Sequence, residues 1–260
     1  MRISLRNRVV LITGASSGIG ALTAEHLAKK GAIPVLTARS DAKLREWSER
    51  IAGEHAVYRM DVTDAAQVNE TVAKVHERYG RLDILLNNAG YGEFVPFESA
   101  PLEHFRDMMD VNYMGVVHCA KAALPYMRRA GQGHIVNVAS LAGKIGTARS
   151  SAYAATKHAV IGLTESLRME LRGTGILVSA VNPGPIDTPF FDRADPEGTY
   201  LRNLGSFIMP ADKVARAIVQ VMERRLPEKD LPGLAAAGVR IRRLFPRWTD
   251  AIAARLLDKK

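Results

Sequence analysis

Short apolar runs alternate with helix-patterned segments along most of the chain, and this alternation restricts the fold more than any other feature. Each run has the length of a strand, and the segments between them carry apolar residues three and four positions apart. The predicted strands are 9–12, 33–37, 55–60, 83–87, 135–139 and 176–181, and the predicted helices are 18–30, 41–51, 65–79, 102–129, 153–171 and 211–225. This order predicts an α/β fold with a doubly wound, mostly parallel sheet in three α/β/α layers, a Rossmann fold.

Local features add detail to this prediction. Leu44 and Trp47 are expected to point inward from helix 41–51. Pro125 is expected to bend or break helix 102–129, because proline has no N–H to donate within a helix. Residues 183–210 hold five prolines and little periodicity, so we expect a long loop there that forms a substrate lid.

The length of 260 residues, with no interdomain linker, predicts one catalytic domain over residues 1–238 and a tail over residues 239–260. The tail has seven basic and two acidic residues, so it contributes +5 to the net charge of +9. Trp248, Ile252 and Leu256 give it one apolar stripe. We expect the tail either to pack on the protein or a neighbouring subunit, or to make weak contact with a membrane surface.

Several classes of protein are disfavoured by composition. No apolar stretch is long enough for a membrane-spanning helix or a signal peptide, so we expect a cytoplasmic protein, at most peripheral on a membrane. The single cysteine, Cys119, lies in an apolar segment and is predicted to be buried. The seven histidines lack ligand spacing, and the basic residues lack a nucleic-acid-binding motif. We therefore expect neither a metal site nor a nucleic-acid partner.

A turn rich in glycine and serine, residues 13–20, lies between the first predicted strand and the first predicted helix. Glycine lets the backbone approach a pyrophosphate closely, and the N-terminus of the helix offers unpaired N–H groups. Because the turn opens a βαβ unit, it predicts a dinucleotide site. The residues predicted to hold the cofactor here are Gly14, Ser16, Ser17, Gly18, Ile19 and Gly20.

The second predicted strand is followed by Arg39, where an NAD site usually has a carboxylate for the ribose 2′-hydroxyl. A guanidinium at this place suits a 2′-phosphate, although a solvated loop cation is the alternative. Arg39 therefore predicts NADP(H) rather than NAD(H). Asp61, after the third strand, is expected near the adenine, and the turn containing Asn88, Ala89 and Gly90 is expected both to lie at the cofactor and to have a structural role.

Ser140, Tyr153 and Lys157 follow the fifth predicted strand. Tyrosine and lysine four residues apart share one face of a helix. An ammonium near a phenol favours the phenolate and lowers the pKa of the phenol toward working pH, so Tyr153 could exchange a proton with a carbonyl or alcohol. Ser140 could hydrogen-bond the same oxygen.

In this order the motifs closely resemble those of the short-chain dehydrogenase/reductase family, in its single-domain branch. The resemblance covers about residues 5–225 and rests on Thr13-Gly-x-x-x-Gly-x-Gly20, Asp61, Asn87-Asn-Ala-Gly90, Asn112, Ser140, Tyr153-x-x-x-Lys157, Asn182-Pro-Gly184 and Thr188. It implies that Tyr153 is the general acid/base and that Ser140 positions the substrate oxygen. Lys157 would bind the nicotinamide ribose and tune Tyr153.

The resemblance implies three further properties. Asn112 would hold a water molecule in a proton relay, and Pro183, Gly184 and Thr188 would lie beside the nicotinamide. Members commonly form dimers or tetramers, which implies a homo-oligomer here. Many members end in a seventh strand and a Val-Asp-Gly-Gly-like turn, whereas this chain has a different sequence over residues 230–238, so the resemblance is not extended beyond about residue 225.

Aromatic residues are frequent in the segments expected to close the substrate pocket, which are residues 91–97, 141–149 and 190–208. They are Tyr91, Phe94, Phe97, Phe190, Phe191, Tyr200 and Phe207. Such a lining predicts an apolar ketone or aldehyde as substrate. The alternatives are an NAD(H)-dependent alcohol dehydrogenase and a non-catalytic dinucleotide-binding sensor or scaffold. The presence of Asn112, Ser140, Tyr153 and Lys157 together favours an enzyme.

Overall fold

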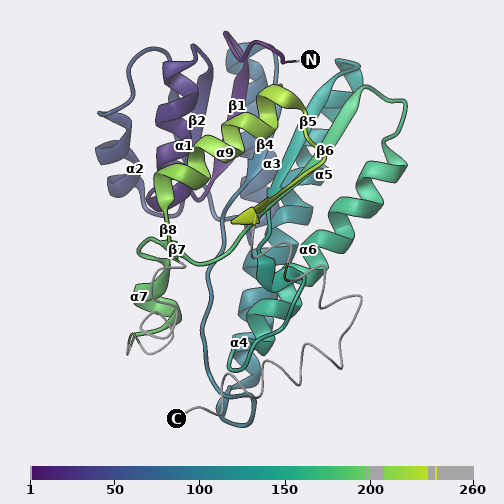
Figure 1. Cartoon of the computed structure of the whole chain (residues 1–260). Helices are drawn as coiled ribbons and strands as arrows, with labels where there is room; N and C mark the ends of the chain where they lie inside the picture. Colours follow the sequence, from purple (N-terminus) through teal and green to yellow (C-terminus); the bar gives the residue numbers. More distant parts are fainter. Residues whose placement is uncertain (1, 197, 199–207, 234–237, 239–260) are drawn as a thin grey trace.

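A seven-stranded parallel sheet forms the centre of the molecule in a computed structural model, which describes residues 2–196, 198, 208–233 and 238 (Figure 1). The strand order is β3-β2-β1-β4-β5-β6-β9. The strands are β1 Val9–Thr13, β2 Ile33–Ala38, β3 Ala56–Arg59, β4 Ile84–Asn87, β5 Gly133–Val138, β6 Ile176–Pro183 and β9 Glu228–Leu231. The predicted doubly wound Rossmann fold is confirmed.

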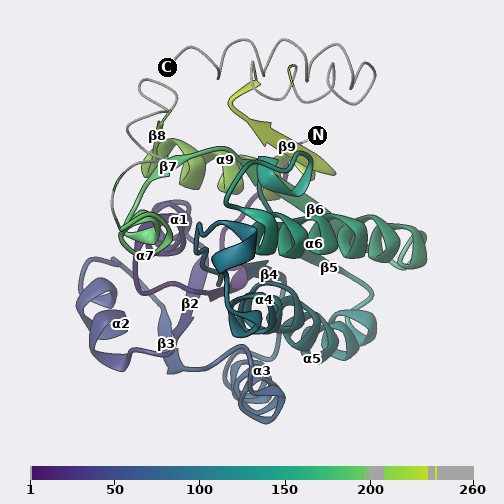
Figure 2. The same ribbon diagram turned by 90° about the horizontal axis from the view of Figure 1, so that it is seen from below.

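Helices cover both faces of the sheet, as the view from below shows (Figure 2). On one face lie α1 Gly18–Lys29, α2 Asp41–Ser48 and α9 Ala211–Arg224, and on the other lie α3 Ala65–Tyr79, α5 Gly115–Arg129 and α6 Ser151–Glu170. Alternate residues of β1 enter the two cores: Val10 and Ile12 pack with α1 and α9, whereas Val9 and Leu11 pack with α3 and α5. A strand buried on both faces therefore reads as one continuous apolar run.

The helix predicted for residues 102–129 is interrupted, but not at Pro125: the predicted break there is wrong, because α5 continues through the proline. The break is a π-helical turn, η2 Asp110–Met114, between α4 Leu102–Met109 and α5. Pro125 stays inside α5 and is exposed, as is Lys121 one turn earlier, so water can satisfy the carbonyl that the proline ring leaves without a donor. Trp47 is also less buried than predicted. Its side chain is only half-buried, and the guanidinium of Arg50 lies over its ring.

The structure contains a seventh strand beyond residue 225, in the part of the chain to which the resemblance is not extended. β9 pairs in parallel with the end of β6, and Asp230 lies opposite Asn182. Three of its four residues are charged. As an edge strand it does not need the apolar run of the inner strands, and its composition concealed it.

Residues 183–210 contain short elements, α7 Phe190–Ala194 and the paired strands β7 Ile186–Asp187 and β8 Met209–Pro210. Within this segment, residues 197 and 199–207 lie outside the described part of the chain, as does the tail at 239–260. Cys119 is fully buried, as predicted, and burial raises the pKa of its thiol to about 12. Among the described residues, no helix is long and apolar enough to cross a membrane.

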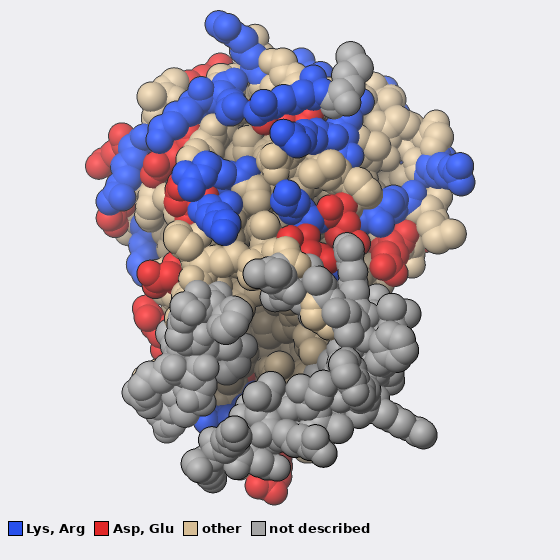
Figure 3. Space-filling model, viewed as in Figure 1, with Lys and Arg blue, Asp and Glu red and all other residues tan. Residues whose placement is uncertain are grey.

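Lys and Arg side chains gather over the upper half of the face shown in Figure 3, where α1 and α9 lie in Figure 1. A groove on this face is lined by Arg2, Lys30, Lys213, Arg216 and Lys229. The positive charge of the protein is therefore not confined to its tail.

Candidate active site

The turn after β1 lies at the carboxyl end of the sheet. The strand order reverses between β1 and β4, so the turn lies at the topological switch point of the sheet. Gly14 adopts φ +66°, and a Cβ there would lie 2.8 Å from the Cα of Ala89. α1 begins at Gly18 with no side-chain cap and no acidic residue in its first turn. Its first N–H groups can therefore bind an anion, and this arrangement fits the pyrophosphate of a dinucleotide.

Asn88 fastens this turn to the end of β4. Its side-chain amide donates to the carbonyl oxygens of Thr13 (3.0 Å) and Gly14 (3.1 Å), while Thr13 Oγ1 accepts from the backbone N–H groups of Asn88 and Ala89, both at 3.0 Å. A Cβ at Gly20 would lie 2.4 Å from the carbonyl oxygen of Gly14. Gly20 does not line the groove described next, so its place in the structure is at this packing contact.

A long groove runs from the Gly14 turn across the ends of β2 and β3. Its lining includes most of the predicted cofactor residues: Gly14, Ser16, Ser17, Gly18, Ile19, Arg39, Asp61, Asn88, Ala89, Gly90 and Thr188. Two cations, Arg39 and Lys43, lie at the β2 end. The nearby carboxylate of Asp41 accepts a hydrogen bond from Arg45 Nε at 2.7 Å, and Asp61 accepts one from the hydroxyl of Thr63 at 2.8 Å.

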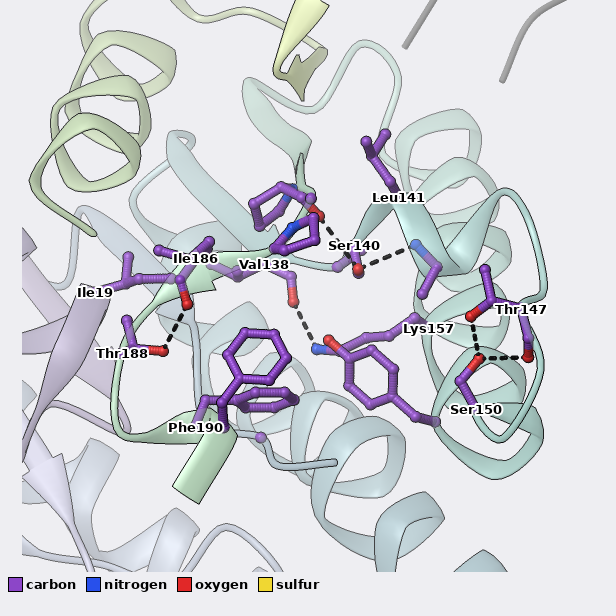
Figure 4. A pocket seen from close by; sticks show the side chains of 18 of the residues that line it. Ile19, Val138, Ser140, Leu141, Thr147, Ser150, Lys157, Ile186, Thr188 and Phe190 are labelled. Carbon is purple, nitrogen blue, oxygen red and sulfur yellow. Dashed lines mark hydrogen bonds between the residues drawn. The ribbon is translucent and has the colours of Figure 1, made fainter. Parts of the chain in front are cut away.

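Figure 4 shows a second cavity from close by. Ile19, Asn88, Gly90 and Thr188 line both this cavity and the groove, so the two adjoin. Its wall is mostly apolar and includes Phe94, Leu141, Ile145, Ile186, Phe190 and Phe191. The rings of Phe94 and Phe190 lie edge-on to Tyr153, with centroids 5.9 and 5.5 Å from that of the tyrosine. Among the described residues that line the cavity, Lys157 alone has a charged side chain.

Ser140, Tyr153 and Lys157 converge on this cavity from two elements. Ser140 caps the single turn η3 Leu141–Gly143, and Tyr153 and Lys157 lie in the first two turns of α6. The Ser140 hydroxyl accepts from the N–H of Ala142 (3.1 Å) and donates to the carbonyl of Pro183 at the long distance of 3.2 Å. A substrate oxygen could therefore replace the Pro183 carbonyl as acceptor at little cost.

Lys157 is almost fully buried behind the tyrosine ring. Its Nζ lies 5.7 Å from the ring centroid of Tyr153 and donates to the carbonyl of Val138 at 3.0 Å (Figure 4). Burial lowers the pKa of Lys157 to about 8, because the charged ammonium loses water. At neutral pH the side chain still carries a proton, so one positive charge lies beside the Tyr153 ring.

Asn112 occupies the π-helical turn and lines neither cavity. Its Oδ1 accepts from the N–H of Tyr91 (2.9 Å), and its Nδ2 donates to the carbonyl of Tyr91 (2.8 Å) and to Thr156 Oγ1 (3.0 Å). These bonds fasten the loop after β4 to α6. The role of Asn112 in a proton relay stays a prediction, and π-helical turns are frequent at functional sites.

A short-chain dehydrogenase family model matches residues 8–198. The chain belongs to the short-chain dehydrogenase family. An uncharacterised oxidoreductase of Staphylococcus saprophyticus is 40% identical over 197 residues, which are 74% of this chain and 84% of that protein. An uncharacterised oxidoreductase of Bacillus subtilis is 35% identical over 97% of this chain and 73% of its own length. The enzyme is therefore a dehydrogenase or reductase with a fold that binds a nicotinamide dinucleotide.

Solved structures agree with this assignment. Levodione reductase is 32% identical, with a TM-score of 0.84 over 90% of this chain and 99% of its own. A family member from Burkholderia phymatum, solved with NAD, is 27% identical, with a TM-score of 0.88 over 95% of this chain and 96% of its own. The closed form of serine dehydrogenase, solved with NADP+, is 28% identical, with a TM-score of 0.80 over 86% of this chain and 94% of its own. These neighbours share the fold of this enzyme, and two of them were solved with different nicotinamide cofactors.

Sequence reasoning missed some residues of the site. Arg193, on α7, lines the groove, stacks 3.7 Å above the ring of Tyr91 and pairs with Glu93 at 2.6 Å. Of the aromatic residues predicted to line the substrate pocket, Phe94, Phe190 and Phe191 do so, whereas Tyr91 lines the groove and Phe97 is 73% exposed. Tyr200 and Phe207 lie outside the described residues.

Proposed function

We propose that this enzyme uses NADP(H) to transfer a hydride between the nicotinamide and an apolar ketone or aldehyde, or the corresponding alcohol. The observation that carries the cofactor choice is the pair of cations, Arg39 and Lys43, at the β2 end of the groove. A 2′-phosphate would meet two positive charges there. The proposed cofactor residues are the predicted ones that line the groove, which are Gly14, Ser16, Ser17, Gly18, Ile19, Arg39, Asp61, Asn88, Ala89, Gly90 and Thr188. Gly20, Tyr153, Lys157, Pro183 and Gly184 complete the set.

The test of the cofactor choice is a fluorescence titration of NADPH and NADH. Wild type is expected to bind NADPH more tightly, and Arg39→Ala is expected to weaken NADPH binding about 10- to 100-fold and to leave NADH binding nearly unchanged. Arg45→Ala is the matched control, because that exposed arginine pairs with Asp41 and does not line the groove. Equal binding of the two cofactors by wild type would contradict the proposal.

The proposed chemistry uses the side chains that face the cavity. When bound, the nicotinamide supplies or accepts the hydride. In the reductive direction Tyr153 donates its hydroxyl proton to the substrate oxygen, and Ser140 turns its hydroxyl from the Pro183 carbonyl to the same oxygen. Lys157 stabilises the phenolate that remains. Asn112 is assigned to the path by which the proton is replaced from solvent.

The cavity lining supports an apolar, uncharged substrate. Its described residues offer no cation other than buried Lys157 to receive a substrate carboxylate, and its phenylalanines offer apolar contact beside Tyr153. One relative, 39% identical over 72% of this chain and 67% of its own length, is the 3-ketodihydrosphingosine reductase of Bacteroides thetaiotaomicron. Oxidation of NADPH should be followed over ketones and aldehydes graded by size and charge. We expect turnover of apolar ketones and none of 2-oxo acids, and the reverse order would refute this substrate class.

An NAD(H)-dependent alcohol dehydrogenase is the second candidate, because the neighbour from Burkholderia phymatum was solved with NAD. The titration above separates the two. A non-catalytic cofactor sensor is disfavoured, because Ser140, Tyr153 and Lys157 line one cavity beside the groove.

We further propose a cytoplasmic homodimer or homotetramer whose catalytic domain spans residues 1–238, with residues 183–210 as the substrate lid. Sedimentation would measure its assembly. The tail at 239–260 is proposed to pack on the protein or to touch a membrane weakly, and flotation with anionic liposomes, with and without the tail, distinguishes the two. Flotation that depends on the tail would support membrane contact, and its absence would support packing.

A further inference from the structure

A cluster of four side chains, Lys144, Asn182, Glu228 and Asp230, joins the turn after Ser140 to the edge of the sheet. Lys144 Nζ donates to both carboxylate oxygens of Asp230, at 2.7 and 2.8 Å, and lies 2.7 Å from Glu228 Oε1. Asn182 Nδ2 donates to Glu228 (2.6 Å) and Asp230 (2.7 Å). We call this group the Lys144 cluster.

Within the Lys144 cluster the ion pair of Lys144 with Asp230 is shielded from water, so it is screened less than a surface pair. The side chain of Lys144 is 12% exposed and that of Asp230 is 7% exposed, whereas Glu228 is 37% exposed. Removing one partner of a buried pair leaves the other charge without compensation. The pairing therefore fixes the position of Lys144 much more firmly than an exposed pair such as Lys74 with Glu70 would.

Lys144 directly follows the turn that Ser140 begins. Within this turn the N–H of Gly143 donates to the carbonyl of Ser140 and the N–H of Lys144 donates to that of Leu141, both at 2.9 Å. On the other side the turn lies flush against α6, since a Cβ at Gly143 would come within 2.6 Å of the carbonyl oxygen of Lys157. The turn is therefore held between α6 and the Lys144 cluster.

The Lys144 cluster also holds the carbonyl that accepts the hydrogen bond of the Ser140 hydroxyl. Asn182 directly precedes Pro183, whose carbonyl accepts that hydrogen bond at 3.2 Å. The N–H of Gly184 donates to the carbonyl of Leu231 at 2.7 Å, which joins the same stretch to β9. Both the chain that carries Ser140 and the carbonyl that orients its hydroxyl are thus tied to one edge strand.

We propose that Lys144, bound to Asp230 and Glu228, is a positioning residue for Ser140. The inference rests on the proposed function, in which Ser140 hydrogen-bonds the substrate oxygen. Without the ion pair the turn loses its attachment to β9, and Ser140 moves relative to Tyr153. A displacement of about 1 Å at a reacting group can lower the rate about 100-fold.

The experiment compares single variants, using an apolar ketone that wild type reduces with NADPH. Lys144→Met is expected to lower kcat about 10- to 100-fold and to change the Kd of NADPH by less than about twofold, because the Lys144 cluster does not line the cofactor groove. Asp230→Asn keeps the shape, leaves Lys144 paired with Glu228, and is expected to lose less activity. Lys74→Met, at the exposed pair on α3, is the matched control and should keep the wild-type kcat.

A double-mutant cycle with Ser140→Ala separates positioning from general stability. If Lys144 acts through Ser140, the double variant is no slower than Ser140→Ala alone. Additive losses, or a Lys144→Met variant as active as wild type, would overturn the inference. If Lys144→Met does not fold, the same cycle with Asp230→Asn gives the decision. A wild type that reduces no carbonyl compound with NADPH would instead refute the proposed function, so the two failures are distinguishable.

Discussion

Replacing Lys157 with Met is predicted to stabilise the free enzyme at neutral pH while removing its activity. Burial lowers the pKa of Lys157 from 10.5 to about 8, which corresponds to a cost of about 3 kcal/mol for keeping the buried ammonium charged at pH 7. The variant also loses the hydrogen bond to Val138, and an unpartnered carbonyl costs about 1–2 kcal/mol. The net gain is about 1–2 kcal/mol, or a rise in Tm of about 2–4 °C.

The gain should depend on pH in a direction set by the lowered pKa. Between about pH 8 and pH 10.5 the unfolded chain holds the lysine proton and the folded chain does not, so wild-type stability rises with pH relative to the variant. Below about pH 8 both states are protonated and the full cost remains. The free energy of unfolding of Lys157→Met relative to wild type should therefore fall by about 2–3 kcal/mol between pH 7 and pH 10, so that the variant is the less stable protein at pH 10.

Urea unfolding of the cofactor-free enzyme at pH 7 and pH 10 measures this difference directly. Lys74→Met is the control, because Lys74 is exposed and its pKa is raised by the hydrogen bond and charge of Glu70. The difference in free energy of unfolding between Lys74→Met and wild type should not show the fall between pH 7 and pH 10 that is expected for Lys157→Met. A Lys157→Met variant that is less stable than wild type at pH 7, or whose effect is independent of pH, would refute the reasoning.

Close contacts at two glycines and the hydrogen bonds of one asparagine give three further predictions. Gly92→Ala would place a Cβ 2.7 Å from the Phe190 ring and 3.1 Å from that of Tyr153, so kcat/KM should fall about 10-fold with NADPH affinity unchanged. Steady-state kinetics check this, and wild-type kinetics would contradict it. Gly20→Ala would clash with the Gly14 carbonyl at 2.4 Å, and NADPH titration should show at least about 10-fold weaker binding. Asn112→Ala removes two hydrogen bonds to Tyr91 and one to Thr156 and should cost about 2–4 kcal/mol, seen as a lower Tm in thermal unfolding.

Helices with local end signals could be predicted from the sequence almost to the residue. α3 has the predicted bounds, because Asp64 caps its N-terminus through two backbone N–H groups and Gly80 ends it with φ +67°. β9 has no such signal, since its charged residues are stabilised by pairing with β6 and by Lys144. The break predicted at Pro125 is wrong for a related reason. Whether a proline ends a helix depends on whether water reaches the carbonyl four residues earlier, here that of exposed Lys121, and the local sequence does not show this.

The motif residues of the site could be predicted because parallel strands bring their carboxyl ends to one edge. Gly14, Asn88 and Ser140 follow three different strands and border one connected space. Contacts between distant segments could not be predicted in this way. Lys144 binds a carboxylate 86 residues away, and Arg193 binds Glu93 across 100 residues, and neither pair leaves a local pattern in the sequence.

The most direct test of the account is the Tyr153→Phe variant, compared with wild type on one apolar ketone in a single turnover with bound NADPH. The hydroxyl is removed while the ring keeps its contacts with Phe94 and Phe190. The account predicts that the rate of NADPH oxidation falls about 100- to 10,000-fold while the Kd of NADPH changes by less than about threefold. A variant that still reduces the ketone at the wild-type rate would contradict the assignment of Tyr153 as the proton donor.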